Sequence, residues 1–350
     1  MRAPRPEAGT FVTPLGRSLA FTRLGFGGGP IGNMHRVLSD ADAEATVATA
    51  WDLGIRYFDT APLYGHGLSE IRIGRSLADR PRSDFTVSTK VGRLLEPCAV
   101  GEEAGGIYRA APGLRVGFDY SRAGVLRSFE DSLRRLGLDR VDILYVHDIE
   151  PRTHGGAEAY EAHLRALIDG GGWRALDELR ASGAVTAIGA GVNQAEACTR
   201  LLGLADPDLF LLAGRYTLLE QAPLHDLLPA CQARGVGVVV GGPFNSGVLV
   251  RPDGAYDYAA APADVLARVQ RLDRVCARFG VALGAAALHF VGAHPAVVSV
   301  IPGGQTVAEV TANVAMADAA IDPAFWAALK DEGLIDPAAP VPRTEAVASC

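Results

Sequence analysis

The chain has 350 residues, of which 49% are hydrophobic, and a formal net charge of −7. This length suits either one large α/β barrel or two ordinary domains and does not decide between them. The acidic balance and the lack of a basic run argue against nucleic acid or an anionic membrane surface as the main partner, so a small-molecule site is favoured.

The cysteines are widely spaced and include no C-x-x-C pair. There are five of them: Cys98, Cys198, Cys231, Cys276 and Cys350. This pattern indicates reduced thiols in a cytoplasm and no zinc cluster. The sequence shows neither a signal-peptide pattern nor an apolar run long enough to span a bilayer, so we expect a cytoplasmic protein without a membrane partner.

The first expected element is a β-hairpin over residues 10–22, whose strands flank a turn containing Pro14 and Gly16. From residue 24 onward, short apolar strands alternate with amphipathic helices. The expected strands are 23–26, 57–59, 85–90, 141–146, 187–192, 209–213, 236–240 and 297–301. The expected helices are 40–53, 69–78, 121–136, 160–168, 173–182, 195–204, 224–234, 262–279 and 306–317.

About eight strand–helix units in one unbroken series favour a single (β/α)₈ TIM barrel over an open doubly wound sheet. No linker interrupts the series, so we expect residues 1–350 to form one domain. Long loops follow Lys90 and Gly241, and we expect them at the C-terminal face, where such loops are often functional. Residues 336–350 are rich in Pro and Ala and are expected to form a mobile tail.

The glycine run at residues 25–29 invites comparison with a dinucleotide-binding fingerprint. Pro30 stands where the third glycine of that fingerprint belongs, and no helix is expected to begin there. We therefore reject a Rossmann site. Gly28 and its neighbours are expected instead to let backbone segments approach closely at the mouth of the barrel.

Polar side chains follow the expected strands. Asp59 ends the second strand, Lys90 the third and His147 the fourth, while Tyr64 lies in the loop just beyond Asp59. The carboxyl ends of barrel strands converge on one pocket. Each residue has an ordinary structural explanation by itself, but their shared placement indicates an active site.

These four residue types together can move a proton. A phenol with a pKa of about 10 exchanges protons poorly at neutral pH unless a cation stabilises its phenolate. Lys90 can supply that cation for Tyr64, and Asp59 can pair with the buried lysine. His147 can orient a substrate oxygen or carry the proton onward. The set therefore predicts a proton relay suited to a carbonyl or carbinol oxygen.

At these residues the sequence resembles the aldo-keto reductase superfamily, over about residues 24–316. The resemblance is strongest in the stretches 59–65 (Asp-Thr-Ala-Pro-Leu-Tyr-Gly), 88–92 (Ser-Thr-Lys-Val-Gly) and 136–148. It implies a catalytic tetrad of Asp59, Tyr64, Lys90 and His147. It further implies hydride transfer to or from a nicotinamide cofactor, without a metal.

The resemblance also implies where the cofactor binds. In the family, residues after the fifth strand hold the carboxamide, a tyrosine after the sixth stacks on the nicotinamide, and the last unit holds the adenosine end. Here Asn193 and Gln194 match the residues that hold the carboxamide. Tyr216 matches the tyrosine that stacks on the nicotinamide, although it can also be a packing residue. The expected cofactor contacts are Gly28, Asn193, Tyr216, Gly241, Pro243, Asn245, Ser246, Gly247, Ile301, Gly303, Gln305, Glu309 and Asn313.

The last unit departs from the family pattern in one respect. Where relatives often carry an arginine for the 2′-phosphate of NADP, this chain has Gln305, and residues 301–317 contain no Lys or Arg. A dianionic phosphate without a cationic partner loses charge-assisted hydrogen bonds. We therefore expect NAD to be used at least as well as NADP.

Residues 211–219 and 241–247 resemble a branch of the superfamily that oxidises aldoses at C1, the D-threo-aldose 1-dehydrogenases. The resemblance implies oxidation of an aldose of the L-fucose or D-arabinose type to its lactone, with Tyr64 as general acid and base. Some relatives oxidise pyridoxal, so a pyridoxal 4-dehydrogenase or a general aldehyde reductase is the alternative. Loops 91–120 and 244–261 are expected to form the substrate pocket of a monomer or small homo-oligomer.

Three other functions compete with this interpretation. A Schiff-base aldolase would use Lys90 as nucleophile, but it leaves the spacing of Asp59 and Tyr64 unexplained. A metal-dependent hydrolase would use His147 and Asp148, but no further His or Asp cluster stands at other strand ends. A nicotinamide-binding sensor or regulatory subunit would keep the pocket yet turn over slowly.

Overall fold

The computed structural model describes residues 6–99, 106–109, 113–251 and 254–342. Its main sheet has eight parallel strands in the order β12-β11-β10-β9-β8-β5-β4-β3. Their bounds are β3 (Phe26–Gly27), β4 (Tyr57–Asp59), β5 (Thr86–Val91), β8 (Ile143–His147), β9 (Ala187–Val192), β10 (Leu209–Ala213), β11 (Gly237–Gly241) and β12 (Val297–Ile301). Parallel bridges from Leu24 to Val300 and from Gly27 to Gly303 close the sheet, which confirms the predicted TIM barrel.

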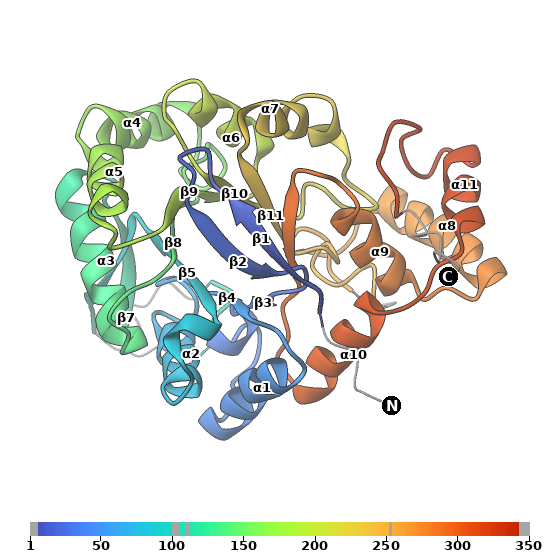
Figure 1. Ribbon diagram of the computed structural model, residues 1–350, viewed down its shortest axis with the longest axis horizontal. Coiled ribbons are helices and arrows are strands. Elements are labelled where there is room, and N and C mark those ends of the chain that lie inside the picture. The colour runs from blue at the N-terminus through green and yellow to red at the C-terminus, as the bar shows by residue number, and fades with distance from the viewer. Residues whose placement is uncertain (1–5, 100–105, 110–112, 252–253, 343–350) are drawn as a thin grey trace.

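Helices surround this barrel (Figure 1). They are α1 (Asp40–Asp52), α2 (Leu68–Leu77), α3 (Arg122–Leu136), α4 (Ala157–Ile168), α5 (Gly172–Ser182), α6 (Ala195–Leu202), α7 (Leu227–Arg234), α8 (Ala263–Phe279), α9 (Leu283–Gly292), α10 (Val307–Ala317) and α11 (Pro323–Asp331). The sequence pattern misses α9 because that helix is apolar and buried on nearly all sides, so it has no polar face. In the described part of the chain no single helix could cross a membrane by length and hydropathy, although α8 and α9, bent by 98°, pass that test as a pair.

An antiparallel hairpin lies across one end of the barrel (Figure 1), as the sequence predicts. It consists of β1 (Ala8–Val12) and β2 (Ser18–Thr22). Leu19 and Phe21 of β2 join an apolar cluster with barrel residues, and the Phe21 ring meets the Tyr57 ring edge-on at 4.8 Å. Because side chains alternate along β2, its apolar residues fill the barrel end while Ser18 and Ala20 face solvent.

The glycine run before the first helix lets the barrel close tightly. A Cβ at Gly27 would lie 2.9 Å from the carbonyl oxygen of Ile301, and one at Gly28 would lie 2.6 Å from the carbonyl oxygen of Asp59. Side chains do not fit at these distances, so glycine permits the close backbone approach that the sequence predicts.

A second antiparallel hairpin, which the sequence pattern does not predict, occupies the long loop after Lys90. Its strands are β6 (Arg93–Pro97) and β7 (Leu114–Phe118), paired from Arg93 and Phe118 to Pro97 and Leu114. The hairpin stands beside the carboxyl end of β5, so it forms part of the mouth of the barrel.

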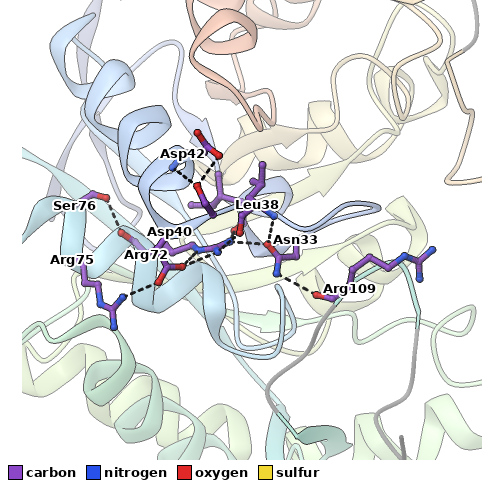
Figure 2. Close-up of polar contacts among 10 residues, drawn as sticks. Asn33, Leu38, Asp40, Asp42, Arg72, Arg75, Ser76 and Arg109 are labelled. Carbon is purple, nitrogen blue, oxygen red and sulfur yellow. Dashed lines mark hydrogen bonds and ion pairs between the residues drawn. The ribbon is translucent and has the colours of Figure 1, made fainter. Parts of the chain in front are cut away.

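Arg72 of α2 is buried, and it fastens the loop that contains the 3₁₀ turn η1 (Pro30–Gly32). Its guanidinium donates to Asp40 Oδ1 at 2.8 and 3.0 Å and to Asn33 Oδ1 at 2.9 Å (Figure 2). It also donates to the carbonyl oxygens of Ile31 at 2.6 Å and Leu38 at 2.9 Å. One side chain thus fixes the whole of residues 31–40.

The same loop holds a further segment of the mouth. Asn33 donates from its side chain to the carbonyl oxygen of Arg109 at 3.2 Å and accepts from the Arg109 backbone N–H at 3.0 Å (Figure 2). A bridge joins Met34 to Tyr108. Arg72 therefore supports, through Asn33, the segment that carries Tyr108.

The described part of the expected tail, residues 336–342, makes specific contacts with the rest of the chain. Asp336 lies 3.0 Å from His225, and Lys330 donates to the carbonyl oxygens of Pro337 and Ala339 at 2.8 and 2.9 Å. Ala339 is 1% exposed and belongs to the main core. Residues 343–350 lie outside the described residues.

We predict that Arg72→Lys lowers the free energy of unfolding by about 2–4 kcal/mol, because a lysine cannot reach all of these acceptors and leaves buried carbonyl oxygens unpaired. Denaturant unfolding measures this. Arg75→Lys is the matched control, since Arg75 pairs with the same Asp40 at 3.3 Å but is 58% exposed and should change stability by less than about 0.5 kcal/mol. Equal, small losses for both variants would contradict the structural role given to Arg72.

Candidate active site

The carboxyl ends of β4 and β5 carry a buried ion pair between Asp59 and Lys90. Register pairs Asp59 with Ser88, so Lys90, two residues further along β5, points to the same side as Ser88. Lys90 Nζ lies 2.8 and 3.0 Å from the two carboxylate oxygens of Asp59 and donates to the carbonyl oxygen of Thr60 at 2.9 Å. The side chains of Lys90 and Asp59 are only 1% and 3% exposed, so each is the other's main compensation for lost hydration.

A column of hydroxyl groups supports this pair from inside the barrel. Ser88 Oγ donates to Asp59 Oδ1 at 2.7 Å, and the Tyr57 hydroxyl lies 3.0 Å from Ser88 Oγ. Burial raises the pKa of Asp59, while Lys90 and the Ser88 hydrogen bond act in the opposite direction. The carboxylate therefore has specific partners on both oxygens.

Tyr64 lies in the loop between β4 and α2, above the ion pair. Its ring centroid is 4.7 Å from Lys90 Nζ and 5.8 Å from the His147 ring, which stands at 88° to it. The next residue, Gly65, has φ +65°, and a Cβ there would lie 2.3 Å from the carbonyl oxygen of Gly32. Glycine at 65 thus lets the loop turn tightly, and the structure brings together all four predicted tetrad residues.

The protonation state of Tyr64 differs from the sequence-based expectation. Burial, and after it the charge of Asp59, raises the pKa of Tyr64 well above its ordinary value. The expectation was that Lys90 would make the phenol acidic, but the positive charge of Lys90 is offset by Asp59 at 2.8 Å. Tyr64 is therefore an uncharged phenol near neutral pH, the form that donates a proton.

His147 ends β8 and is 4% exposed. Burial lowers its pKa to about 3, so the imidazole is neutral at physiological pH. The Tyr120 hydroxyl donates to the carbonyl oxygen of His147 at 2.7 Å, and His147 Nδ1 is buried without a partner among the described residues. His147 can thus serve as a hydrogen-bonding group but not as a cation.

Charged side chains surround His147. They are not among the site residues expected from the sequence. Asp148 Oδ2 lies 3.5 Å from His147 Nε2 and 2.5 Å from Arg93 of β6. The Asn193 side chain donates to Asp148 at 3.1 Å and to Glu150 at 3.0 Å. The only local signal was that Asp148 directly follows His147, since Arg93 arrives from a hairpin that the sequence pattern does not predict. Among the described residues no group of three or more His, Cys, Asp or Glu side chains is arranged to hold a metal ion.

The two loops expected to form the substrate pocket contribute aromatic side chains. The Tyr108 ring centroid is 6.2 Å from that of Tyr64. Tyr258 lies in a two-residue turn in which Asp257 and Tyr258 both have positive φ, 51° and 65°. Asp257 pairs with Arg215 at 3.0 Å and also with Arg152, and these contacts hold the turn across the mouth.

The loop after β11 contains small residues in left-handed conformations, at Gly242, Asn245, Ser246 and Gly247. Backbone of this kind can turn N–H groups toward an anion, so the loop suits the phosphates of the cofactor that residues 241–247 are expected to contact. The Asn245 side chain is occupied within the protein, accepting from Thr217 at 2.6 Å and donating to Gly214 at 3.0 Å. It therefore ties this loop to the end of β10.

Two expected cofactor residues are covered by protein atoms. Tyr216 is 0% exposed, and its ring packs against Phe290 at 5.4 Å and His294 at 5.5 Å. The space where a Gly28 side chain would lie is filled by protein atoms of Asp59, Ile73 and Ser69. The described structure does not bring either residue to an open pocket face.

The expected adenosine end lies beyond β12. Gln305 donates to the carbonyl oxygens of Pro30 at 3.0 Å and Met34 at 2.6 Å, and its backbone N–H donates to Glu309 at 2.6 Å. Its side-chain oxygen accepts from Arg36 Nε at 2.8 Å. Sequence reasoning missed Arg36, because only the fold brings a residue 269 positions away next to Gln305.

Comparisons with known proteins agree with this fold. The Aldo/keto reductase family model matches residues 23–332. The chain is 44% identical to a pyridoxal 4-dehydrogenase from Microbacterium luteolum, over 92% of this chain and 97% of that protein. It is 41% identical to a D-threo-aldose 1-dehydrogenase from a Pseudomonas species, over 91% and 95%.

A solved aldo-keto reductase from Bacillus halodurans, in its holo form, shares the fold, with a TM-score of 0.71 at 24% identity over 97% of this chain and 99% of that one. The barrel, the residues at its strand ends and these matches lead to one conclusion. The chain belongs to the aldo/keto reductase family and is an NAD(P)-dependent oxidoreductase.

Proposed function

We propose that this enzyme oxidises an aldose of the L-fucose or D-arabinose type at C1, passing hydride to NAD and leaving the lactone. The observation that carries the proposal is the arrangement of Tyr64, Lys90 and His147, with the Tyr64 ring centroid 4.7 Å from Lys90 Nζ and 5.8 Å from the His147 ring. The relative named D-threo-aldose 1-dehydrogenase supports the substrate class. A relative of similar identity is named pyridoxal 4-dehydrogenase, and pyridoxal, like an aldose, can present a cyclic hemiacetal.

In this proposal Tyr64 handles the proton of the C1 hydroxyl. In the oxidising direction Tyr64, which is partly exposed, first releases its own proton to solvent. As phenolate it then takes the hydroxyl proton, while the C1 hydrogen would pass as hydride to the nicotinamide. Lys90 stabilises the phenolate in part, because Asp59 both keeps Lys90 in place and offsets its charge. In the reverse direction the uncharged phenol, the form favoured by burial, donates to the carbonyl oxygen.

His147 orients the reacting oxygen. Because its pKa is lowered to about 3, it acts as a neutral hydrogen-bond partner and leaves proton transfer to Tyr64. The bound nicotinamide supplies the hydride acceptor. Asn193, the loop 241–247 and residues 301–313 would hold that cofactor. The Asn193 amide nitrogen already donates to two carboxylates, so its oxygen is the group left to contact the carboxamide.

The substrate assignment predicts turnover of L-fucose, D-arabinose and L-galactose with NAD, measured by NADH absorbance. Pyridoxal in the same assay is the comparison. Turnover of pyridoxal alone would replace the sugar assignment with the alternative, whereas binding of NAD without turnover of any sugar or aldehyde would favour a sensor.

We predict that Tyr64→Phe lowers kcat by about 10²- to 10⁴-fold, since the variant keeps the ring but loses the acidic proton. The dissociation constant for NAD, measured by fluorescence titration, should stay the same. Tyr108→Phe is the matched control, because Tyr108 is a buried phenol whose ring centroid lies 6.2 Å from that of Tyr64 and which has no proton-transfer role in this proposal. A near-normal rate for Tyr64→Phe would show that the proton donor is assigned wrongly.

We predict that kcat/KM with NAD is at least as high as with NADP. Glu309 accepts from the Gln305 N–H at 2.6 Å, so a negative charge stands at the expected 2′ position. Gln305→Arg should raise kcat/KM for NADP by about tenfold or more. Arg36, whose Nε donates to the Gln305 side chain, is the cation that could bind a 2′-phosphate, and Arg36→Gln tests this. A tenfold preference of the parent enzyme for NADP that is lost in Arg36→Gln would show that Arg36 binds the phosphate. The NAD assignment would then be wrong.

A further inference from the structure

Asp148 stands directly beside the group that orients the reacting oxygen. Its carboxylate Oδ2 lies 3.5 Å from His147 Nε2. Its φ is +50°, a left-handed conformation that Asp adopts more readily than most residues with a side chain. Its backbone N–H donates to the carbonyl oxygen of Gly191 at 2.8 Å, which fixes this conformation at the end of β9. The backbone is thus held in a geometry that leaves the carboxylate next to His147.

The partners of Asp148 leave hydrogen-bonding capacity unused. Arg93 lies 2.5 Å from Oδ2, and Asn193 donates to Oδ1 at 3.1 Å. A carboxylate can accept about four hydrogen bonds, so acceptor positions remain. Arg93 Nε is also buried without a partner among the described residues. The Asp148 and Arg93 side chains are 11% and 12% exposed, a degree of burial at which unused polar groups are costly.

The Asp148 carboxylate lies beside the imidazole that the Tyr64 ring meets edge-on. After burial, its charge is among the causes that raise the pKa values of Tyr64, Tyr108 and Tyr258, which come from three different loops. Asp148 Oδ2 lies 3.5 Å from the Nε2 atom of His147, and the His147 ring centroid is 5.8 Å from that of Tyr64. The carboxylate is therefore next to the residue that the proposal gives to the reacting oxygen.

We propose that Asp148 accepts a hydrogen bond from the hydroxyl on the carbon next to the reacting carbon, and so selects aldoses and other 2-hydroxy aldehydes over aldehydes that lack this hydroxyl. His147 Nε2 and Asp148 Oδ2, a donor beside an acceptor 3.5 Å apart, match the neighbouring oxygens of a vicinal diol, which lie about one hydrogen-bond length apart. Arg93 and Asn193 hold the carboxylate in position. The inference rests on the proposed function, because it uses the role given there to His147.

A purely structural role for Asp148 is the competing explanation. Through Arg93, the ion pair also fastens the hairpin β6–β7 to the barrel. Asp142 offers a matched control, since it precedes the same strand, β8, at the opposite end and pairs with Arg82 at 2.7 Å with side chains 13% and 20% exposed. Asp142→Asn removes a comparable ion pair far from His147.

The test compares reduction of 2-hydroxypropanal and propanal, which differ only in the neighbouring hydroxyl, with NADH and with NADPH. We expect the parent enzyme to favour 2-hydroxypropanal in kcat/KM by about ten- to hundredfold, the effect of one hydrogen bond to a charged acceptor. This preference should shrink in Asp148→Asn, which keeps the shape but not the charge, and disappear in Asp148→Ala. The readout is the ratio of the two kcat/KM values, and Asp142→Asn should keep the full preference. Thermal unfolding of each variant checks that it is folded, and if Asp148→Ala is not, Asp148→Asn alone decides.

Equal loss of activity on both aldehydes in the Asp148 variants, or no preference in the parent enzyme, would overturn the inference. The proposed function fails separately, because the aldehyde pair contains no sugar. A parent enzyme that oxidises no aldose but shows the 2-hydroxyl preference, lost in the Asp148 variants, would refute the aldose assignment and support the role of Asp148.

Discussion

The buried ion pair between Lys90 and Asp59 is the interaction on which the rest of the site depends. Two charges with side chains 1% and 3% exposed are tolerable only together, since removing one partner leaves the other uncompensated. Ser88 and the Thr60 carbonyl complete their coordination, and the Tyr64 ring lies over them. The pairing also limits what Lys90 does for Tyr64, because a neutralised ammonium shifts the pKa of a neighbouring phenol much less than a free one.

The mouth of the barrel is built differently from its floor. The floor is apolar and formed by side chains of the strands and of the hairpin β1–β2. The mouth consists of loops joined by charged and amide side chains from distant parts of the chain. Arg72 fastens residues 31–40, Arg93 joins the hairpin β6–β7 to Asp148, and Asp257 joins two arginines across the opening. The positions of the loops at the mouth therefore depend on hydrogen bonds and ion pairs more than on apolar packing.

This division explains how much the sequence could predict. Strands β4 and β8 are short, largely apolar runs that end in Asp59 and His147, and β5 is a buried run of Thr, Val and Ser with Lys90 next to its last residue. Local pattern was therefore enough to place these three residues at one end of the barrel. The hairpin β6–β7 is short and mostly half-buried, so it shows no clean alternation. Arg36 and Arg93 enter the mouth through tertiary contacts that no local pattern encodes. The balance of burial and charge at Tyr64 also needs coordinates.

The hairpin β1–β2 has a practical consequence. It begins at Ala8, whose side chain is exposed, on the face of the barrel opposite the strand ends that carry the tetrad residues. A linker attached ahead of this hairpin would therefore extend from the face of the barrel opposite the pocket. Immobilising the protein on a bead or electrode through that end orients the catalytic opening toward bulk solution, which favours diffusion of reactants to and from it.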